Sequence, residues 1–185
     1  MKNPEVKKKL GYVSDDMFFF HGYSLQDMRN FYKGLYEDWN DERFQVLVKD
    51  FGLHMKRKIS TFSKGMQKQA AIILALSIMP DYLILDEPID GLDPIMRLKA
   101  WKHIIDDVAD RNTSVLVSSH NLREMEGYCD SMLSPKQAPP AIAATVRTVL
   151  PPTMWFIHRK MGVQAAKVPH EVPLLRSEAS CRERV

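Results

Sequence analysis

The segment Tyr82-Leu83-Ile84-Leu85 is continuously apolar, and the sequence Asp86-Glu87-Pro88 follows it directly. Such a short apolar run is typical of a strand in a parallel sheet, where helices cover both faces. A second run of this kind, Ser114–Ser118, lies further along the chain. Helix signals fill the interval between the two runs. The sequence therefore predicts an α/β fold built on a mostly parallel sheet.

Capping residues mark the predicted helices. Ser24 and Asp27 have the spacing of a capping box, and Asn40 precedes a second helix that Gly52 ends. The remaining signals are a helix over residues 65–79 that Pro80 ends, a helix that Asp93 caps and Pro94 opens, and a short helix from about Asn121. Since residues 24–79 carry helix signals alone, we expect them to form a helical layer inserted into the core.

Two finer predictions concern burial and a further strand. Residues 9–13 form a short strand candidate that ends in the loop Ser14-Asp15-Asp16. The helix that follows Asp93 is expected to bury one stripe of side chains. The members of this predicted stripe are Leu98, Trp101, Ile105 and Val108.

Composition excludes several classes of protein. The net charge of +3 gives no general case for nucleic acid as a partner. The longest apolar stretch, residues 70–79, is far shorter than the roughly 20 residues of a bilayer span. The N-terminal residues lack the pattern of a signal peptide. Cys129 and Cys181 are too few for a disulfide framework, which favours a reducing cytoplasm.

The chain changes character near residue 131. Residues 131–185 hold seven of the eleven prolines and carry a balance of +5, against −2 for residues 1–130. Because they show no clear helix or strand period, we expect them to be mostly disordered. A basic partner-binding tail and a shifted reading frame or cloning junction are two alternatives. The predicted division is thus a domain over residues 1–130 and a proline-rich tail over residues 131–185.

The acids after the first apolar run carry the most chemistry. Parallel strands open their ligand sites at their carboxyl ends. Asp86 and Glu87 stand at such an end, and we expect alternation along the strand to direct them to opposite faces. One acid can hold Mg²⁺ through its water shell while the other activates a water molecule. His120 follows the second strand and can converge on the same ligand. The alternative is that these residues merely end the strands.

A possible anion site lies upstream of the acids. Ser63 and Gly65 stand at the start of the long buried helix, where backbone N–H groups and the helix dipole favour a negatively charged group. A plain helix cap is the competing explanation.

Taken together, four short segments resemble the motifs of an ABC transporter ATPase in order and spacing. Residues 62–69 resemble the signature motif and Leu83 to Pro88 the Walker B motif, while residues 91–94 resemble the D-loop and Ser118 to His120 the switch histidine. The resemblance covers residues 9–130 and is closest to simple bacterial exporters of drugs, peptides or lipids, of the ABC-2 type. It implies a partial P-loop NTPase core that binds ATP and Mg²⁺.

This resemblance also implies a role for each site residue. Asp86 would coordinate Mg²⁺, Glu87 would be the general base, and His120 would contact the γ-phosphate. Ser63 and Gly65 would meet the γ-phosphate of a nucleotide held by the opposite subunit, and Asp93 would communicate across the dimer. Asp15 occupies the position of the Q-loop glutamine, where an acid can still hold Mg²⁺.

One motif of the family is absent from the sequence. No Gly-x-x-x-x-Gly-Lys-Ser/Thr occurs in the 185 residues, so we expect an N-terminally incomplete domain. The missing elements would otherwise cover the apolar faces of residues 83–85 and 115–117. We therefore expect the polypeptide alone to be marginally stable and inactive, with an ATP affinity weaker than micromolar in a direct titration.

An aromatic segment, Phe18-Phe19-Phe20-His21 with Tyr23, follows the Asp15 loop. Burial between the sheet and the helical layer is the favoured interpretation. By family resemblance, the alternative is a surface that receives a coupling helix of the membrane subunit.

The leading hypothesis is the ATP-hydrolysing subunit of an ABC membrane transporter. Its expected partners are a second nucleotide-binding subunit and a transmembrane permease, and no nucleic acid. Its expected location is the cytoplasm, peripheral on the inner face of the membrane. Two alternatives stay open: a non-catalytic fragment that completes a partner's site with Ser63 and Asp93, and an ABC ATPase of DNA repair or chromosome maintenance.

Overall fold

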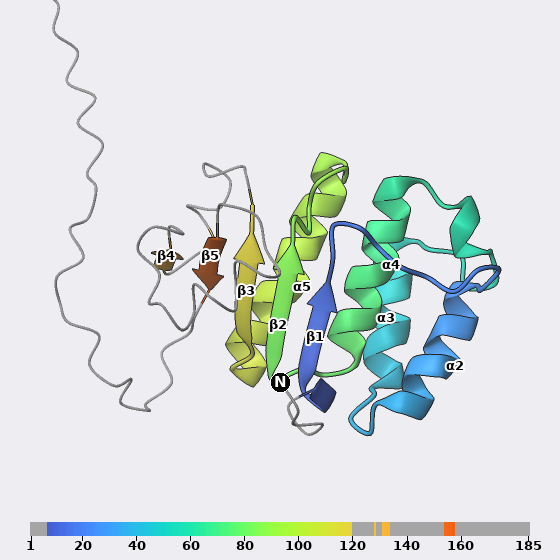
Figure 1. Cartoon of the computed structure of the whole chain (residues 1–185), viewed down its shortest axis with the longest axis horizontal. Helices are drawn as coiled ribbons and strands as arrows, with labels where there is room; N and C mark the ends of the chain where they lie inside the picture. The colour runs from blue at the N-terminus through green and yellow to red at the C-terminus, as the bar shows by residue number, and fades with distance from the viewer. Residues whose placement is uncertain (1–6, 120–127, 129–130, 134–153, 158–185) are drawn as a thin grey trace, which may run out of the picture.

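The computed structural model describes residues 7–119 and 128, together with the backbone of residues 131–133 and 154–157. After a short N-terminal segment, a helical stretch separates β1 from β2 and a single helix separates β2 from β3 (Figure 1). Their order is β1 (Leu10–Val13), α2 (Leu25–Leu35), α3 (Asp41–Phe51), the 3₁₀ turn η1 (Ile59–Thr61), α4 (Lys64–Ser77), β2 (Tyr82–Asp86), α5 (Pro94–Arg111), β3 (Ser114–Ser118), β4 (Ser131–Leu133) and β5 (Met154–Ile157).

The described strands form a five-stranded sheet in the order β1-β2-β3-β5-β4. β1, β2 and β3 run parallel, and the register pairs Val13 with Leu85 and Leu85 with Val117. β5 pairs antiparallel with both β3 and β4. The predicted α/β fold with a mostly parallel sheet is therefore confirmed for β1 to β3. The predicted short helix from about Asn121 lies outside the described residues.

Part of the proline-rich segment differs from its sequence-based description. Residues 131–133 and 154–157, which we expected to be disordered, form the strands β4 and β5. The hydrogen bonds that an antiparallel edge strand makes with its neighbour order such short segments even where no helical or alternating pattern is evident. The other residues of the segment 134–185 lie outside the described part.

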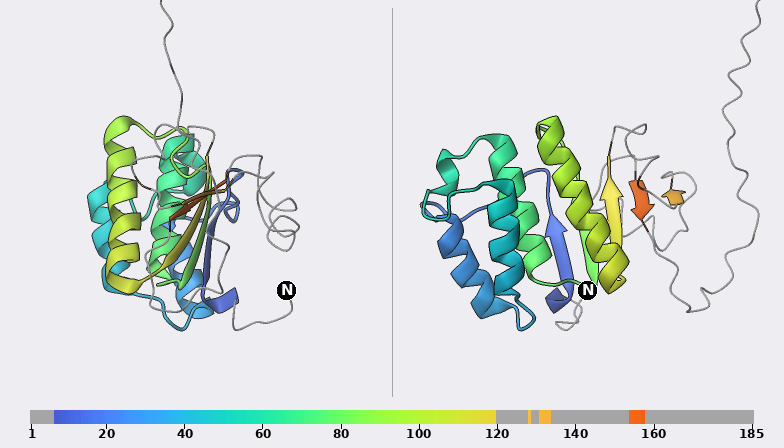
Figure 2. Two further views of the ribbon diagram at one scale, coloured as in Figure 1. Left: turned by 90° about the vertical axis from the view of Figure 1, so that its left-hand side faces the viewer. Right: turned by 180° about the vertical axis from the view of Figure 1, so that it is seen from behind.

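Helices cover one face of the sheet (Figure 2, left view). Leu83, Leu85, Val115 and Val117 are buried on that face, so the expected exposure of apolar faces of residues 83–85 and 115–117 is wrong for these four side chains, and it is the opposite face that is incompletely covered. The intervening residues Ile84 and Leu116 are half-buried, and Tyr12 beside them is 45% exposed. The apolar run of β2 therefore has one fully covered face rather than two, because α4 and α5 pack on the same side.

The predicted helical layer is confirmed, and its ends follow the capping residues. Ser24 and Asp27 form both hydrogen bonds of the capping box at the start of α2. Asn40 caps α3, and Gly52 ends it in the left-handed conformation at φ 70°. α4 stops at Ser77, two residues earlier than predicted, because Met79 adopts a positive φ of 53°. None of the helices that the structure describes has the length and hydropathy of a membrane span.

The buried stripe of α5 is partly different from the predicted one. Trp101 and Val108 are buried as expected, but Leu98 is 63% exposed and Ile104, rather than Ile105, lies fully inside. A polar residue explains the shift, since Asp107 occupies the stripe. Its carboxylate accepts a 2.6 Å hydrogen bond from Arg43 of α3. A buried ion pair thus takes a position that the hydrophobic pattern could not identify.

Asp41, the first residue of α3, links α3 to α2 and to the segment between these two helices. Its carboxylate accepts hydrogen bonds from Arg29 (2.6 Å), Lys33 (2.8 Å) and Trp39 (2.7 Å). These donors, Arg29 first among them, hold the pKa of Asp41 well below its usual range. A carboxylate with a depressed pKa stabilises the fold above the unfolded-state pKa, and this stabilisation is lost as the pH falls toward the folded-state pKa.

We expect Asp41→Asn to lower the free energy of unfolding at pH 7 by about 1–2 kcal/mol. The difference from the wild type should shrink in acid, below the ordinary carboxyl pKa of about 4. Urea unfolding followed by tryptophan fluorescence at pH 7 and pH 3 measures both effects. Asp106→Asn, which removes an exposed pair with Lys102, is the control and should change stability by less than about 0.5 kcal/mol. Equal losses in the two variants at pH 7 would contradict the role of Asp41.

Candidate functional site

The acids predicted from the sequence stand where β2 and β3 end. Asp86 is the last residue of β2 and pairs with Ser118 of β3. The Ser118 hydroxyl donates a 2.5 Å hydrogen bond to Oδ1 of Asp86. The Ser118 carbonyl accepts a 3.2 Å hydrogen bond from the backbone N–H of Glu87. Ser118 therefore fixes both acids across the sheet.

Ser118 is a site residue that the sequence analysis did not select. The signal was present, because a polar residue ended an otherwise apolar strand. Its side chain is fully buried, and a buried hydroxyl requires a hydrogen-bond partner. Asp86 is that partner because of the strand register, and the register is defined only in the folded sheet.

Glu87 adopts a left-handed backbone conformation with φ 44°. It lies outside β2, so strand alternation does not set the direction of its side chain, and the divergence of the two acids stays a prediction. Its carbonyl accepts a 3.2 Å hydrogen bond from the N–H of Asp90, which closes a tight turn. A glutamate in this region carries a conformational cost that is characteristic of functional sites.

Lys68 of α4 is the second residue that the sequence analysis missed. Its side chain has no exposed surface. Its ammonium donates to Oδ1 of Asp15 at 3.0 Å and to the carbonyl of Glu87 at 3.0 Å. Asp15, Lys68 and Glu87 therefore meet, although they come from the loop after β1, from α4 and from the turn after β2. A lysine within an apolar helix was the only signal for this contact in the sequence.

Ser63 and Gly65 occupy the start of α4, as predicted. Ser63 is the N-cap, and its hydroxyl accepts a 3.2 Å hydrogen bond from the N–H of Met66. A methyl group at Gly65 would lie only 2.6 Å from the carbonyl oxygen of Gly91. The first turn of α4 is thus in close contact with the turn that follows Glu87, and only glycine permits this approach.

Asp93 and His120 complete the set of predicted residues. Asp93 is exposed and caps α5, where one carboxylate oxygen accepts 3.1 Å hydrogen bonds from the N–H groups of Ile95 and Met96. His120 lies outside the described residues, so its convergence on the acids stays a prediction. Among the described residues, no group of three or more metal-ligating side chains comes together.

The aromatic segment after Asp15 is mostly exposed, against the favoured prediction of burial. Phe19 is partly buried and packs on the core, but Phe18 is 82% exposed. Phe20 lies within 5.8 Å of Phe18, 5.1 Å of Tyr23 and 5.0 Å of Phe31 of α2, measured between ring centroids. We call Phe18, Phe20, Tyr23 and Phe31 the aromatic cluster. The sequence could not place Phe31 here, because that contact depends on the packing of α2.

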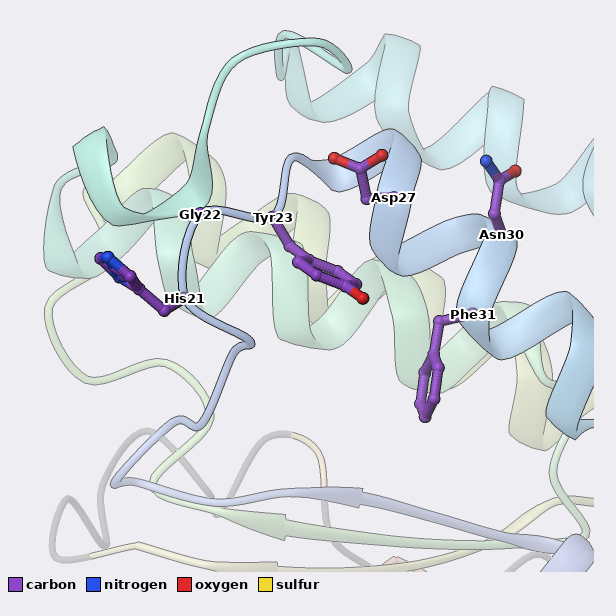
Figure 3. A pocket seen from close by; sticks show the side chains of 6 residues that line it. All are labelled: His21, Gly22, Tyr23, Asp27, Asn30 and Phe31. Carbon is purple, nitrogen blue, oxygen red and sulfur yellow. The ribbon is translucent and has the colours of Figure 1, made fainter.

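A cavity of about 600 Å³ lies beside the aromatic cluster. Its lining residues are His21, Gly22, Tyr23, Asp27, Asn30 and Phe31. Figure 3 shows that the rings of Tyr23 and Phe31 extend from the loop and from α2, while His21 points away from them. A second cavity of about 330 Å³ includes Phe19, Phe20 and His21 in its wall. Exposed aromatic rings between two hollows form a surface suited to contact with an apolar partner.

Known proteins resemble this chain in sequence and in fold. The family model described as ABC transporter matches residues 1–90. The ABC transporter ATP-binding protein YtrB of Bacillus subtilis is 28% identical over 129 residues, which is 70% of this chain and 44% of that protein. The chain therefore spans less than half the length of YtrB.

Two solved structures share the fold of this chain. One is an ATP-binding subunit of an ABC transporter, with a TM-score of 0.62 and 24% identity over 67% of this chain and 53% of the other. The other is a dimeric bacterial ABC transporter cassette, with a TM-score of 0.57 and 19% identity over 66% of this chain and 59% of the other.

The contact between α4 and the turn after Glu87 predicts the effect of a methyl group at Gly65. We expect Gly65→Ala to lower the free energy of unfolding by about 1–3 kcal/mol, because the new methyl overlaps a backbone carbonyl. Gly34→Ala is the matched control, since a methyl there meets no atom within 4 Å and should stabilise α2 by about 0.5–1 kcal/mol. Urea unfolding of both variants measures the difference. Unchanged stability in Gly65→Ala would refute the close contact.

Proposed function

We propose that the protein is an ATP-hydrolysing subunit of an ABC membrane transporter, on the basis that residues 1–90 match the family model described as ABC transporter. The single observation that carries the proposal is the pair of acids at the end of β2, where Ser118 binds the carboxylate of Asp86 and Lys68 binds the backbone carbonyl of Glu87. Paired acids at the carboxyl end of a parallel strand are suited to phosphoryl transfer.

Each acid has a separate task in this proposal. The carboxylate of Asp86 would hold Mg²⁺, directly or through water, and Mg²⁺ would neutralise charge on the phosphate oxygens. The carboxylate of Asp86 is a suitable ligand for Mg²⁺, because Ser118 donates a hydrogen bond to only one of its oxygens and further lone pairs stay available. Glu87 would accept a proton from the attacking water. His120 would donate a hydrogen bond to the γ-phosphate, and Asp15 would lie at the rim of the same site.

The start of α4 would serve a nucleotide held by a second subunit. The exposed Ser63, together with the N–H groups of the first turn, presents the positive end of a helix of 14 residues. Asp93 lies at the start of α5, near the turn that contacts Gly65. We propose that two nucleotide-binding subunits close around ATP, so that each completes the site of the other.

The printed sequence contains no Gly-x-x-x-x-Gly-Lys-Ser/Thr motif. A loop of that kind supplies backbone donors and a lysine that neutralise the phosphates, whereas Asp86 and Glu87 repel them. We propose that this polypeptide does not turn over ATP on its own. The contribution of Ser63 and Asp93 to a partner's nucleotide is independent of that motif.

The aromatic cluster is the surface that we propose for the permease. Phe18 is 82% exposed and Phe20 38%, and Tyr23 and Phe31 line one neighbouring cavity while Phe20 lines the other, so an apolar segment of a membrane subunit could cover this cluster. This contact would hold the protein at the inner face of the membrane, in the cytoplasm. The exposure of these rings favours the interface over the core as their role.

The proposed chemistry predicts a specific loss in an assembled transporter in which a Gly-x-x-x-x-Gly-Lys-Ser/Thr loop completes the nucleotide site beside Glu87 of this chain. Glu87→Gln should lower ATP turnover by about 100-fold or more, because the amide cannot accept the proton of the attacking water. ATP binding should be retained. The measurements are phosphate release and nucleotide binding, and Asp81→Asn, which changes an exposed acid paired with Lys9, is the control. Turnover above a tenth of the wild-type value in Glu87→Gln would overturn the assignment.

The aromatic cluster predicts a second loss that is independent of catalysis. Phe18→Ser, at the ring that is 82% exposed, should strongly reduce co-purification with the permease while far-ultraviolet circular dichroism and the unfolding midpoint stay near those of the wild type. Phe19→Ser is the contrasting variant. It should reduce stability by about 1–3 kcal/mol because Phe19 packs on the core. Permease binding that persists at the wild-type level in Phe18→Ser would exclude this surface.

A further inference from the structure

Lys68 connects three segments that are distant in the sequence. Its ammonium group lies 3.0 Å from Oδ1 of Asp15 and 3.0 Å from the carbonyl oxygen of Glu87. Lys68 itself stands in the second turn of α4, five residues after the N-cap Ser63. The helix start, the loop after β1 and the turn after β2 are therefore joined through one side chain.

The burial of the Lys68 side chain carries a desolvation free-energy cost. A fully buried ammonium loses its hydration, and the Asp15 carboxylate together with the Glu87 carbonyl must compensate for it. An apolar residue of similar length would fill the same volume without that cost. A buried ion pair is weak evidence for stability, so the position of the charge requires another explanation.

The hydrogen bond to Glu87 supplies that explanation. The Glu87 carbonyl also accepts the N–H of Asp90, which closes the turn, and the Glu87 N–H is bound by Ser118. These contacts hold a glutamate backbone at φ 44°, a conformation that it rarely adopts. Lys68 thus binds the carbonyl of Glu87. The orientation of this peptide group helps to set the direction in which the Glu87 side chain leaves the backbone.

A second contact links the same two segments. Gly65, one turn before Lys68, lies against the carbonyl of Gly91. The turn after Glu87 is therefore held to α4 at two points, at the first turn of the helix and at the second. A displacement of the helix start would be passed to Glu87 through both contacts.

We propose that Lys68 is a positioning residue that fixes the backbone of Glu87 and couples it to the N-terminal turn of α4. This role rests on the proposed function, in which Glu87 is the general base and the start of α4 senses a phosphate on the opposite subunit. Binding of that phosphate would be communicated to the base through Lys68. The Asp15 carboxylate holds the ammonium in place for this purpose.

Backbone hydrogen exchange of the full 185-residue chain, followed by NMR, tests the proposal without nucleotide. In Lys68→Met the amide of Asp90 should exchange at least about ten-fold faster than in the wild type. The amides of Leu47 and Val48 in α3 report global unfolding and should change by a smaller factor. Asp15→Asn keeps an acceptor for the ammonium, so Asp90 should stay within about three-fold of the wild type.

Two results would overturn the proposal. One is an unchanged exchange rate at Asp90 in Lys68→Met, and the other is an equal acceleration at Asp90, Leu47 and Val48, which means that Lys68 only stabilises the fold. Lys102→Met, at an exposed pair with Asp106, is the control and should change neither group. Should Lys68→Met not fold, Lys68→Gln, which keeps a donor without the charge, is judged by the same criterion.

A kinetic measurement in the assembled transporter separates this proposal from the proposed function. Lys68→Met should lower kcat per active site by about ten-fold or more while KM for ATP stays within about three-fold. A wild-type assembly without ATP turnover would refute the proposed function, and the exchange experiment would still decide the role of Lys68 in the Glu87 turn. Normal kcat in Lys68→Met would refute the positioning role.

Discussion

The parallel pairing of β2 with β3 is the constraint on which the site depends. It sets Asp86 opposite Ser118, so that one hydroxyl binds the carboxylate of Asp86 and the backbone of the same residue binds Glu87. Register in a parallel pair is set by the burial of alternate side chains, here Leu83 and Leu85 against Val115 and Val117. The apolar core therefore determines where the acids stand.

Local signals in the sequence predicted most of the fold. The capping box of Ser24, the Asn40 cap and the left-handed Gly52 all act within a few residues, and such interactions are formed by the segment itself. The apolar runs of β2 and β3 were equally clear. The motif positions of Ser63, Gly65, Asp86 and Glu87 followed from spacing, and the structure places all four near the turn after β2.

Contacts between distant segments could not be predicted in the same way. The buried partners of Asp86 and Glu87, namely Ser118 and Lys68, depend on sheet register and on the depth at which α4 packs. The stripe of α5 shifted because Arg43 pairs with Asp107 across two helices. The exposure of Phe18 and Phe20 was missed because hydrophobicity alone does not distinguish a core from an interface.

The left-handed conformation of Glu87 has a consequence for any attempt to make this protein more robust. Glycine adopts a positive φ far more readily than glutamate, so substitutions that relax this turn are favoured by folding and remove the carboxylate. In the proposed function the Glu87 carboxylate accepts a proton from water, so selection for thermal tolerance alone would favour variants without this base. Under that proposal, resistance to heat and ATP turnover would oppose each other at this position.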